Sequence, residues 1–176
     1  MNITVIGRGN VGGGLADRWR AAGHDVQALG QDGGDASGAD VVVVAVPSGQ
    51  IADALAKVGG IDGKIAIDTT NAIGGRPEGF ESLAHQVQSI TGGPTSKAFN
   101  TVFARQYDEI DAASPSCLWC GDDGAAAVTE QLVRDAGYEP VKVGDLRHAA
   151  GLEDLLLNVI FPVARERQSP FFYRIY

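Results

Sequence analysis

Four consecutive valines, Val41–Val44 in the run "DVVVVAV", constrain the fold more than any other feature of this sequence. A strand that is apolar on both faces is typical of the centre of a parallel sheet, where helices cover both sides. Other short β-rich runs alternate with helical stretches along the whole chain. The pattern therefore predicts an α/β fold with a doubly wound, mostly parallel sheet.

The expected strands and helices follow one another closely. Strands are expected at "NITVIG", "DVQAL", "DVVVVAV", "KIAIDT", "SKAFNT", "SCLWC" and "EPVKVG". Helices are expected over residues 10–22, 48–58, 78–87, 102–107 and 124–136. Apolar residues at helical spacing predict a longer C-terminal helical segment, about 146–168, which Pro162 would kink.

Composition limits the class of protein. The 176 residues, 44% of them hydrophobic, contain no repeat and no linker, so we expect a single domain spanning 1–176. Fourteen basic residues against 22 acidic ones give a formal charge of -8, which argues against nucleic acid or an anionic membrane as a partner. Met1 leads directly into a strand pattern, without a signal peptide or a bilayer-spanning run, so a cytoplasmic location is expected.

The first strand is followed by "GRGNVG", which opens the first helix. In a Rossmann-type fold the first glycine permits the tight turn, the second lets a pyrophosphate approach the backbone, and the third permits close helix–strand packing. The helix N-terminus then offers N–H groups to the phosphates. The sequence predicts dinucleotide binding by the six residues Gly7, Arg8, Gly9, Asn10, Val11 and Gly12.

Two more glycines, Gly13 and Gly14, follow inside the predicted helix. Each costs a helix roughly 1 kcal/mol relative to alanine. Either very close packing or a loosened first turn would explain them, and the sequence leaves both open.

The second crossover, "QDGGDASG", is unusually short. A connection between parallel strands usually needs a dozen or more residues, typically a helix, and here there is room only for a loop or a single turn. An Asp or Glu at the end of the second strand favours NAD, and a nearby Arg favours the 2′-phosphate of NADP. The chain has Gln31 there and an acid, Asp32, only after it. Arg8 is the nearest phosphate partner, unless it is simply solvated.

Polar residues follow three further strands, where ligands of open α/β sheets bind. "AVPS" places Val46, Pro47 and Ser48 beside the expected cofactor. Thr69 and Asn71 in "DTTNAIGG", and Asn100 in "KAFNTV", have short polar groups that can orient a nicotinamide amide or a substrate. Helix caps or turns are the alternative for each of them, and Ser48 in particular precedes a helical run.

The sequence indicates neither a metal site nor a thiol redox site. Cys117 and Cys120 lie three apart in a strand pattern, so they face opposite sides of the sheet, and two thiols cannot complete a zinc site. "GDD" (residues 121–123) is expected to be a turn and a helix cap. The three histidines show no catalytic or ligand spacing, but an oxidoreductase whose two partners are both cofactors needs no acid–base pair.

Taken in order, "GRGNVG", "AVP", "KAFNTVFA", "CGDD" and "YEPVKVGDL" resemble the NADP oxidoreductases that use the deazaflavin coenzyme F-420. They are also similar to the cytosolic reductase domain of the six-transmembrane metalloreductases. The resemblance covers most of the chain, and "KAFNTV" followed at a distance by "CGDD" is its most specific part. The family's phosphate-reading residues correspond to Gly30 and Gln31.

The resemblance implies an oxidoreductase that transfers hydride between a nicotinamide cofactor, NADP rather than NAD, and a deazaflavin or flavin. The nicotinamide would lie against the strand ends, with the second ring system stacked over it near Ser48, Asn100 and Val102, the residues expected to shape the hydride site. The resemblance also implies a homodimer formed through the C-terminal helical segment.

Two alternatives stay open from the sequence. The short crossover and the extra glycines would suit a cofactor-binding or sensing module without turnover. A reductase of a small imine or keto substrate is the other alternative, and its catalytic residues would be expected in the C-terminal helix. Arg147, His148 and Glu153 are the polar candidates there, although a solvated helix face is the simpler interpretation of all three.

Overall fold

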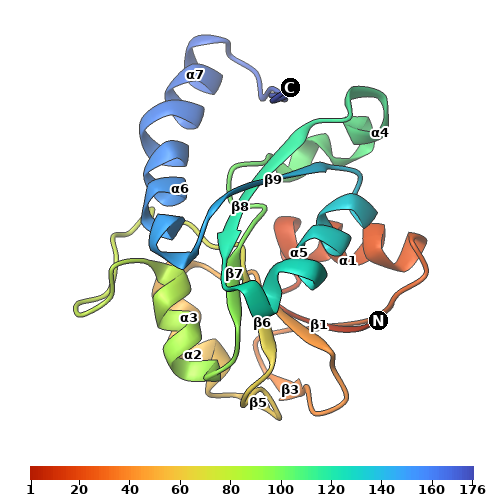
Figure 1. Ribbon diagram of the computed structural model, residues 1–176, viewed down its shortest axis with the longest axis vertical. Helices are drawn as coiled ribbons and strands as arrows, with labels where there is room; N and C mark the ends of the chain where they lie inside the picture. Colours follow the sequence, from red (N-terminus) through yellow and green to blue (C-terminus); the bar gives the residue numbers. More distant parts are fainter.

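A computed structural model describes residues 1–176, whose centre is a seven-stranded sheet in the order β2-β1-β4-β6-β7-β8-β9 (Figure 1). The strands are β1 (Asn2–Ile6), β2 (Asp25–Leu29), β4 (Val41–Val44), β6 (Ile65–Asp68), β7 (Thr95–Lys97), β8 (Ser116–Gly121) and β9 (Glu139–Gly144). Only the β7–β8 pair is antiparallel. The predicted Rossmann-type α/β fold is confirmed. Each predicted strand run overlaps a strand, although β7 begins one residue before the "SKAFNT" run and ends already at Lys97.

Helices cover both faces of the sheet (Figure 1). One face is covered by α1 (Asn10–Ala21), α5 (Asp123–Asp135), η2 (Ala104–Glu109) and α4 (Ile110–Ala113). The other is covered by α2 (Ile51–Leu55), which follows the 3-10 turn η1 (Ser48–Gln50), and by α3 (Leu83–Thr91) and α6 (Ala149–Leu155). All four valines of β4 are fully buried between these layers, as their run predicts.

The helix predicted over 78–87 is wrong at its start. The observed helix α3 begins at Leu83, where the Ser82 side chain caps it by accepting a hydrogen bond from the His85 N–H (3.2 Å). Gly75 and Gly79 take positive φ angles in the preceding loop, a conformation that stops a helix from starting earlier. The predicted helix over 102–107 also differs, because it is a 3-10 helix shifted toward Glu109.

The C-terminal segment is a run of consecutive helical elements. It comprises η3 (Leu146–His148), α6, the π-helical segment η4 (Leu156–Ile160) and α7 (Phe161–Glu166). The wide π turn lies just before Pro162, whose ring would clash with a carbonyl of the preceding α-helical turn. The predicted irregularity at Pro162 therefore takes the form of a π segment. The C-terminal segment has three exposed apolar residues, Val159, Phe161 and Val163. The homodimer that was expected to form through this segment stays a prediction.

The short second crossover contains no helix, as predicted, but it forms a strand that the sequence did not reveal. Gly34–Asp35 (β3) pairs in parallel with Val58–Gly59 (β5), making a two-stranded sheet beside the main one. Gly33 makes this possible because its φ is +76° and a side chain there would overlap the Lys57 carbonyl. The crossover is therefore tied to the end of α2.

Close packing, and not a loosened turn, explains the second extra glycine. Helix α1 is continuous from Asn10, and a methyl group at Gly14 would overlap the ring of Tyr107. We therefore expect Gly14→Ala to lower the free energy of unfolding by about 1–3 kcal/mol, despite the better helix propensity of alanine. Gly151→Ala is a matched control, since it faces open space in α6 and should be neutral or stabilising. Urea unfolding of both variants would test this, and equal effects would contradict it.

The two cysteines are buried on opposite faces of β8, so the rejection of a redox pair is supported. Cys117 belongs to the core under α1 and α5, and Cys120 to the core under α6. Burial raises the pKa of both thiols to about 12, which keeps them protonated at neutral pH. No helix is both long enough and apolar enough to cross a membrane.

Candidate functional site

A cleft runs along the carboxyl ends of the central strands, where the chain order reverses between β1 and β4. It has two lobes that share Gly9, Ala45, Val46 and Pro47. The first lobe, about 810 Å³, is also lined by Ile6, Gly7, Arg8, Gly30, Gln31, Asp32, Gln50, Asp53, Ala54 and Lys57. The second, about 550 Å³, is also lined by Asn10, Val11, Ser48, Thr69, Thr70, Asn71, Ile73 and Gly74. Such a crevice is the usual ligand site of an open α/β sheet.

The three glycines of "GRGNVG" differ in what surrounds them. Gly7 has a φ of +105°, and a side chain there would overlap the Ala45 carbonyl oxygen. A methyl group at Gly12 would overlap the carbonyl oxygen of Gly7. At Gly9, by contrast, no atom beyond its own chain neighbours lies within 4 Å of where a Cβ would be. Gly7 and Gly12 therefore serve the fold, and Gly9 leaves an open backbone surface toward the cleft.

The N-terminus of α1 faces this open surface. Gly9 is the N-cap, no side chain caps the helix, and its first turn contains no acidic residue. The first N–H groups of an α-helix have no partner within the helix, and its dipole is positive at that end. The arrangement can bind a phosphate group without any cationic side chain.

Two cations and two carboxylates line the outer part of the first lobe. The Arg8 side chain lies across Gly30, where a methyl group would be 2.9 Å from its Nε. Lys57 donates from Nζ to the Gln31 carbonyl oxygen at 3.1 Å. Asp32 and Asp53 line the same lobe. Sequence reasoning missed Lys57 because only the β3–β5 pairing brings the end of α2 beside Gln31.

The second lobe collects several of the predicted residues. Pro47, Ser48, Thr69 and Asn71 line it together with Asn10 and Val11. The Ser48 side chain caps no helix, which removes the alternative role considered for it. The Thr69 hydroxyl donates to the Val44 carbonyl oxygen at 2.9 Å, so its oxygen is held at the floor of the lobe. The lobe is also lined by Ile73, an apolar residue that is 70% exposed and that was not among the residues predicted from the sequence.

Asn100 and Val102 do not line either lobe. Asn100 is 2% exposed and lies beneath Asn71, whose side-chain oxygen accepts from Asn100 Nδ2 at 3.0 Å. The same Nδ2 donates to the Leu152 carbonyl oxygen at 3.0 Å, so Asn100 links the lobe to α6. Val102 packs against the core. The structure therefore gives Asn100 the position of a residue that orients Asn71, and it places Val102 away from the lining of both lobes.

A buried ionic cluster lies under the second lobe. Lys97, at the end of β7, contacts Asp68 at 2.6 Å and Glu153 at 3.0 Å, and all three side chains are fully buried. Lys97 also donates to the Thr70 carbonyl oxygen (2.9 Å), which fixes the loop that lines the lobe. Arg76 closes the cluster through Glu153 Oε2 at 2.6 Å, and this hydrogen bond raises the Arg76 pKa.

The interpretation of Glu153 as part of a solvated helix face is wrong, because its side chain is fully buried in this cluster. Its other oxygen, Oε1, accepts from the Leu83 N–H at 2.9 Å, so the carboxylate joins α6, α3 and β7. Glu153 stood out in the sequence only as a polar residue among leucines. Its buried partners come from residues about 55–85 positions away, and no local pattern indicates them.

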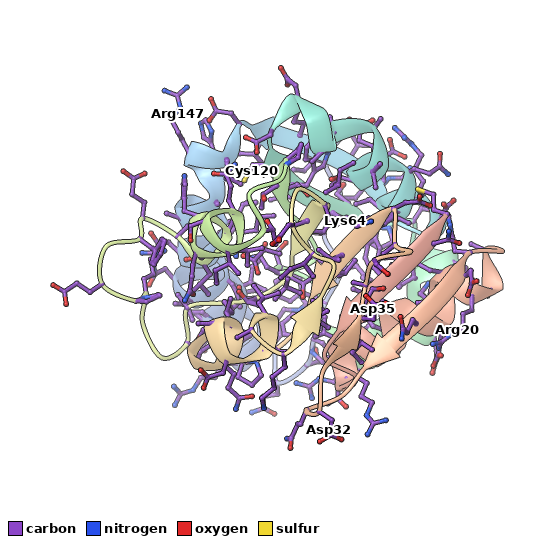
Figure 2. All side chains as sticks on the ribbon, turned by 90° about the horizontal axis from the view of Figure 1, so that it is seen from below. Arg20, Asp32, Asp35, Lys64, Cys120 and Arg147 are labelled. Carbon is purple, nitrogen blue, oxygen red and sulfur yellow. The ribbon has the colours of Figure 1, made fainter.

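Arg147 and His148 are exposed and line neither lobe. This position agrees with the simpler interpretation of both residues as part of a solvated helix face. Arg147 pairs with Asp145 at 2.7 Å, and its hydrogen bonds lower the Asp145 pKa to about 2. Figure 2 shows Arg147 projecting on the opposite side of the molecule from Asp32, which lies at the rim of the first lobe. These residues have no route to a ligand in the cleft.

Comparison with solved structures identifies relatives of this fold. A protein of Arthrobacter sp. FB24, provisionally described as an F420-dependent NADP-reductase, superposes with a TM-score of 0.83 and 25% identity, covering 100% of this chain and 99% of the other. The predicted resemblance is confirmed. The similarity to the Arthrobacter protein extends from the glycine loop to the C-terminal helices, so it includes every element that forms the cleft.

Two other structures show a more distant similarity. A hypothetical protein of Sinorhizobium meliloti is 26% identical, with a TM-score of 0.64, over 86% of this chain and 88% of that one. A reductive aminase of Aspergillus terreus in complex with NADPH is 14% identical with a TM-score of 0.69, and this chain spans 63% of its length. The aminase shares the fold alone. No family model and no curated protein matches the sequence.

Proposed function

We propose that this protein is a nicotinamide-dependent oxidoreductase that binds NADP and passes hydride between it and a deazaflavin or flavin. The observation that carries the proposal is the cleft itself, in which the open Gly9 backbone and the uncapped N-terminus of α1 lie between two lobes. The whole-chain similarity to the Arthrobacter protein supports the same reaction class.

The residues of the cleft suit a dinucleotide. Its two lobes are of unequal size and meet at Gly9, so an adenosine in the first lobe and a nicotinamide in the second would place the pyrophosphate at the helix N-terminus. The loop from Gly7 to Gly12 then holds the phosphates, with Gly9 and the first N–H groups of α1 in contact with them and Gly7 and Gly12 shaping the turn. Gln31 lies at the ribose position, and Val46 and Pro47 separate the lobes.

The side chains of the second lobe would position the nicotinamide. Asn71, oriented by Asn100, and Thr69 present polar atoms at the strand ends, while Pro47 and Val11 provide apolar surface. A bound nicotinamide supplies the hydride chemistry, and the protein supplies orientation and exclusion of water. Ser48 and Ile73 line the same lobe and would contact the acceptor.

The alternative reductase of a small imine or keto substrate lacks support from the site. Its candidate acid–base residues, Arg147, His148 and Glu153, are either exposed away from the cleft or buried in the ionic cluster. The second lobe contains no histidine, lysine, aspartate or glutamate that would protonate a substrate. Hydride exchange between two ring systems needs no such group.

Binding and turnover would test the proposal in two steps. Titration of NADPH, NADH, NADP and NAD at one fixed salt concentration should show NADPH and NADP bound more tightly than their counterparts. Oxidation of NADPH should then require an added deazaflavin or flavin. Turnover with small carbonyl or imine acceptors alone would contradict the acceptor, and failure of all four nucleotides to bind would contradict the whole proposal.

A further inference from the structure

We infer that Lys57 and Arg8 together form the site that recognises the 2′-phosphate of NADP. This inference rests on the proposed function and adds to it a specificity-determining residue from an element that the fold does not normally use for this purpose. The general rule places the ribose reader at the end of β2. Here that position holds Gly30 and Gln31, which carry no charge.

The two cations approach this point from different sides. Arg8 comes from the glycine loop and lies across Gly30, while Lys57 comes from the turn between α2 and β5 and reaches the Gln31 carbonyl oxygen (3.1 Å). Both line the first lobe. A dianionic phosphate bound over Gly30 and Gln31 would therefore find a guanidinium and an ammonium within the same lobe, and charge-assisted hydrogen bonds to phosphate are among the strong ones.

Neither cation is engaged by a carboxylate. Neither Arg8 nor Lys57 takes part in an ion pair. The Arg and Lys side chains that do are Arg18, Arg20, Arg76, Lys97, Arg134, Lys142 and Arg147. Asp32 and Asp53 line the same lobe without pairing with them. Both side chains are therefore available to neutralise an anion bound in this lobe.

The small β3–β5 sheet holds Lys57 in place. The Lys57 carbonyl oxygen accepts from the Gly34 N–H at 3.2 Å, and Gly33 packs against the same carbonyl. The backbone of Lys57 is thereby fixed to the crossover that follows β2. The shortness of this crossover, which removes the usual helix, is what allows the turn after α2 to take over phosphate recognition.

The test compares Lys57→Met, which keeps most of the aliphatic stem, with Lys64→Met. Lys64 is a matched control because it too ties the crossover, donating to the Ser37 and Ala39 carbonyl oxygens (2.8 and 2.7 Å), but does not line the cleft. Figure 2 shows Lys64 well away from Asp32. Affinities for NADPH and NADH would be measured for wild type and both variants, at two salt concentrations.

Lys57→Met should weaken NADPH binding by about 10-fold or more and change NADH binding by less than about threefold. Lys64→Met should keep the wild-type ratio, and salt should reduce the NADPH preference of the wild type. An unchanged NADPH-to-NADH ratio in Lys57→Met would overturn the inference. So would a wild-type preference for NADH, which would assign Asp32 to the ribose hydroxyls. An unchanged ratio leaves the proposed function standing. A preference for NADH overturns NADP as the cofactor but leaves a nicotinamide-dependent oxidoreductase standing, whereas failure of wild type to bind either nucleotide overturns both proposals.

Discussion

Replacing Glu153 with alanine is expected to lower the free energy of unfolding by about 3–5 kcal/mol, because it removes a fully buried carboxylate that pairs with both Lys97 and Arg76 and accepts from the Leu83 N–H. Lys97 would keep only Asp68 as a counter-ion, and all three side chains are fully buried. The Leu83 N–H at the start of α3 would also lose its acceptor. The expected loss is therefore larger than for most single substitutions in a domain of this size.

Urea unfolding gives the measurement, and Arg147→Ala is the control. Arg147 also forms an ion pair on the C-terminal segment, but its side chain is 80% exposed, so its removal should cost far less stability than that of Glu153. Glu153→Gln should lie between the two, since the amide oxygen can still accept from Leu83. Equal losses for Glu153→Ala and Arg147→Ala would show that the cluster contributes little.

The same cluster has a consequence for the second lobe. Lys97 donates to the Thr70 carbonyl oxygen, and Asn100 joins Asn71 to the Leu152 carbonyl oxygen next to Glu153. The loop after β6 is thus fixed from below by groups that never touch the cleft. Phe99, with a φ of 62°, turns the chain between Lys97 and Asn100, and such an unfavourable backbone angle persists only where packing enforces it.

Local patterns were enough to predict the sheet and the glycine loop. The valine run of β4 and the alternation of strands with helices depend on burial that each segment shows in its own sequence. "GRGNVG" is equally local, because the positive φ of Gly7 and the contact of Gly12 with the Gly7 carbonyl oxygen both arise within a single strand–turn–helix unit. These features needed no knowledge of the rest of the chain.

The parts that sequence reasoning missed depend on contacts between distant segments. Lys57 reaches Gln31 only through the β3–β5 pair, whose strands are two residues each and too short to show a period. Glu153 resembles a surface residue until Lys97 and Arg76 are placed beside it. Asn100 was expected in the cleft because it follows a strand, but the positive φ at Phe99 precedes it and its amide lies beneath Asn71.

Gly9→Val is expected to weaken NADPH binding by roughly 100-fold or more, about 2.7 kcal/mol, without unfolding the protein. The valine side chain would occupy the open space where the backbone of Gly9 faces the cleft, and it would keep a pyrophosphate from the N–H groups of α1. No atom beyond the two chain neighbours lies within 4 Å of the new Cβ position, and the φ of -75° at Gly9 suits an L-residue. Binding titration and urea unfolding of the same preparation would measure both quantities.

Gly12→Ala separates a binding effect from a folding effect. A methyl group there would overlap the Gly7 carbonyl oxygen, so this variant should lose stability by about 1–3 kcal/mol, whereas Gly9→Val should change it by less than about 1 kcal/mol. If Gly9→Val instead binds NADPH with unchanged affinity, the pyrophosphate does not lie on this loop. A Gly9→Val protein that loses as much stability as Gly12→Ala would mean that Gly9 serves the fold and not the ligand.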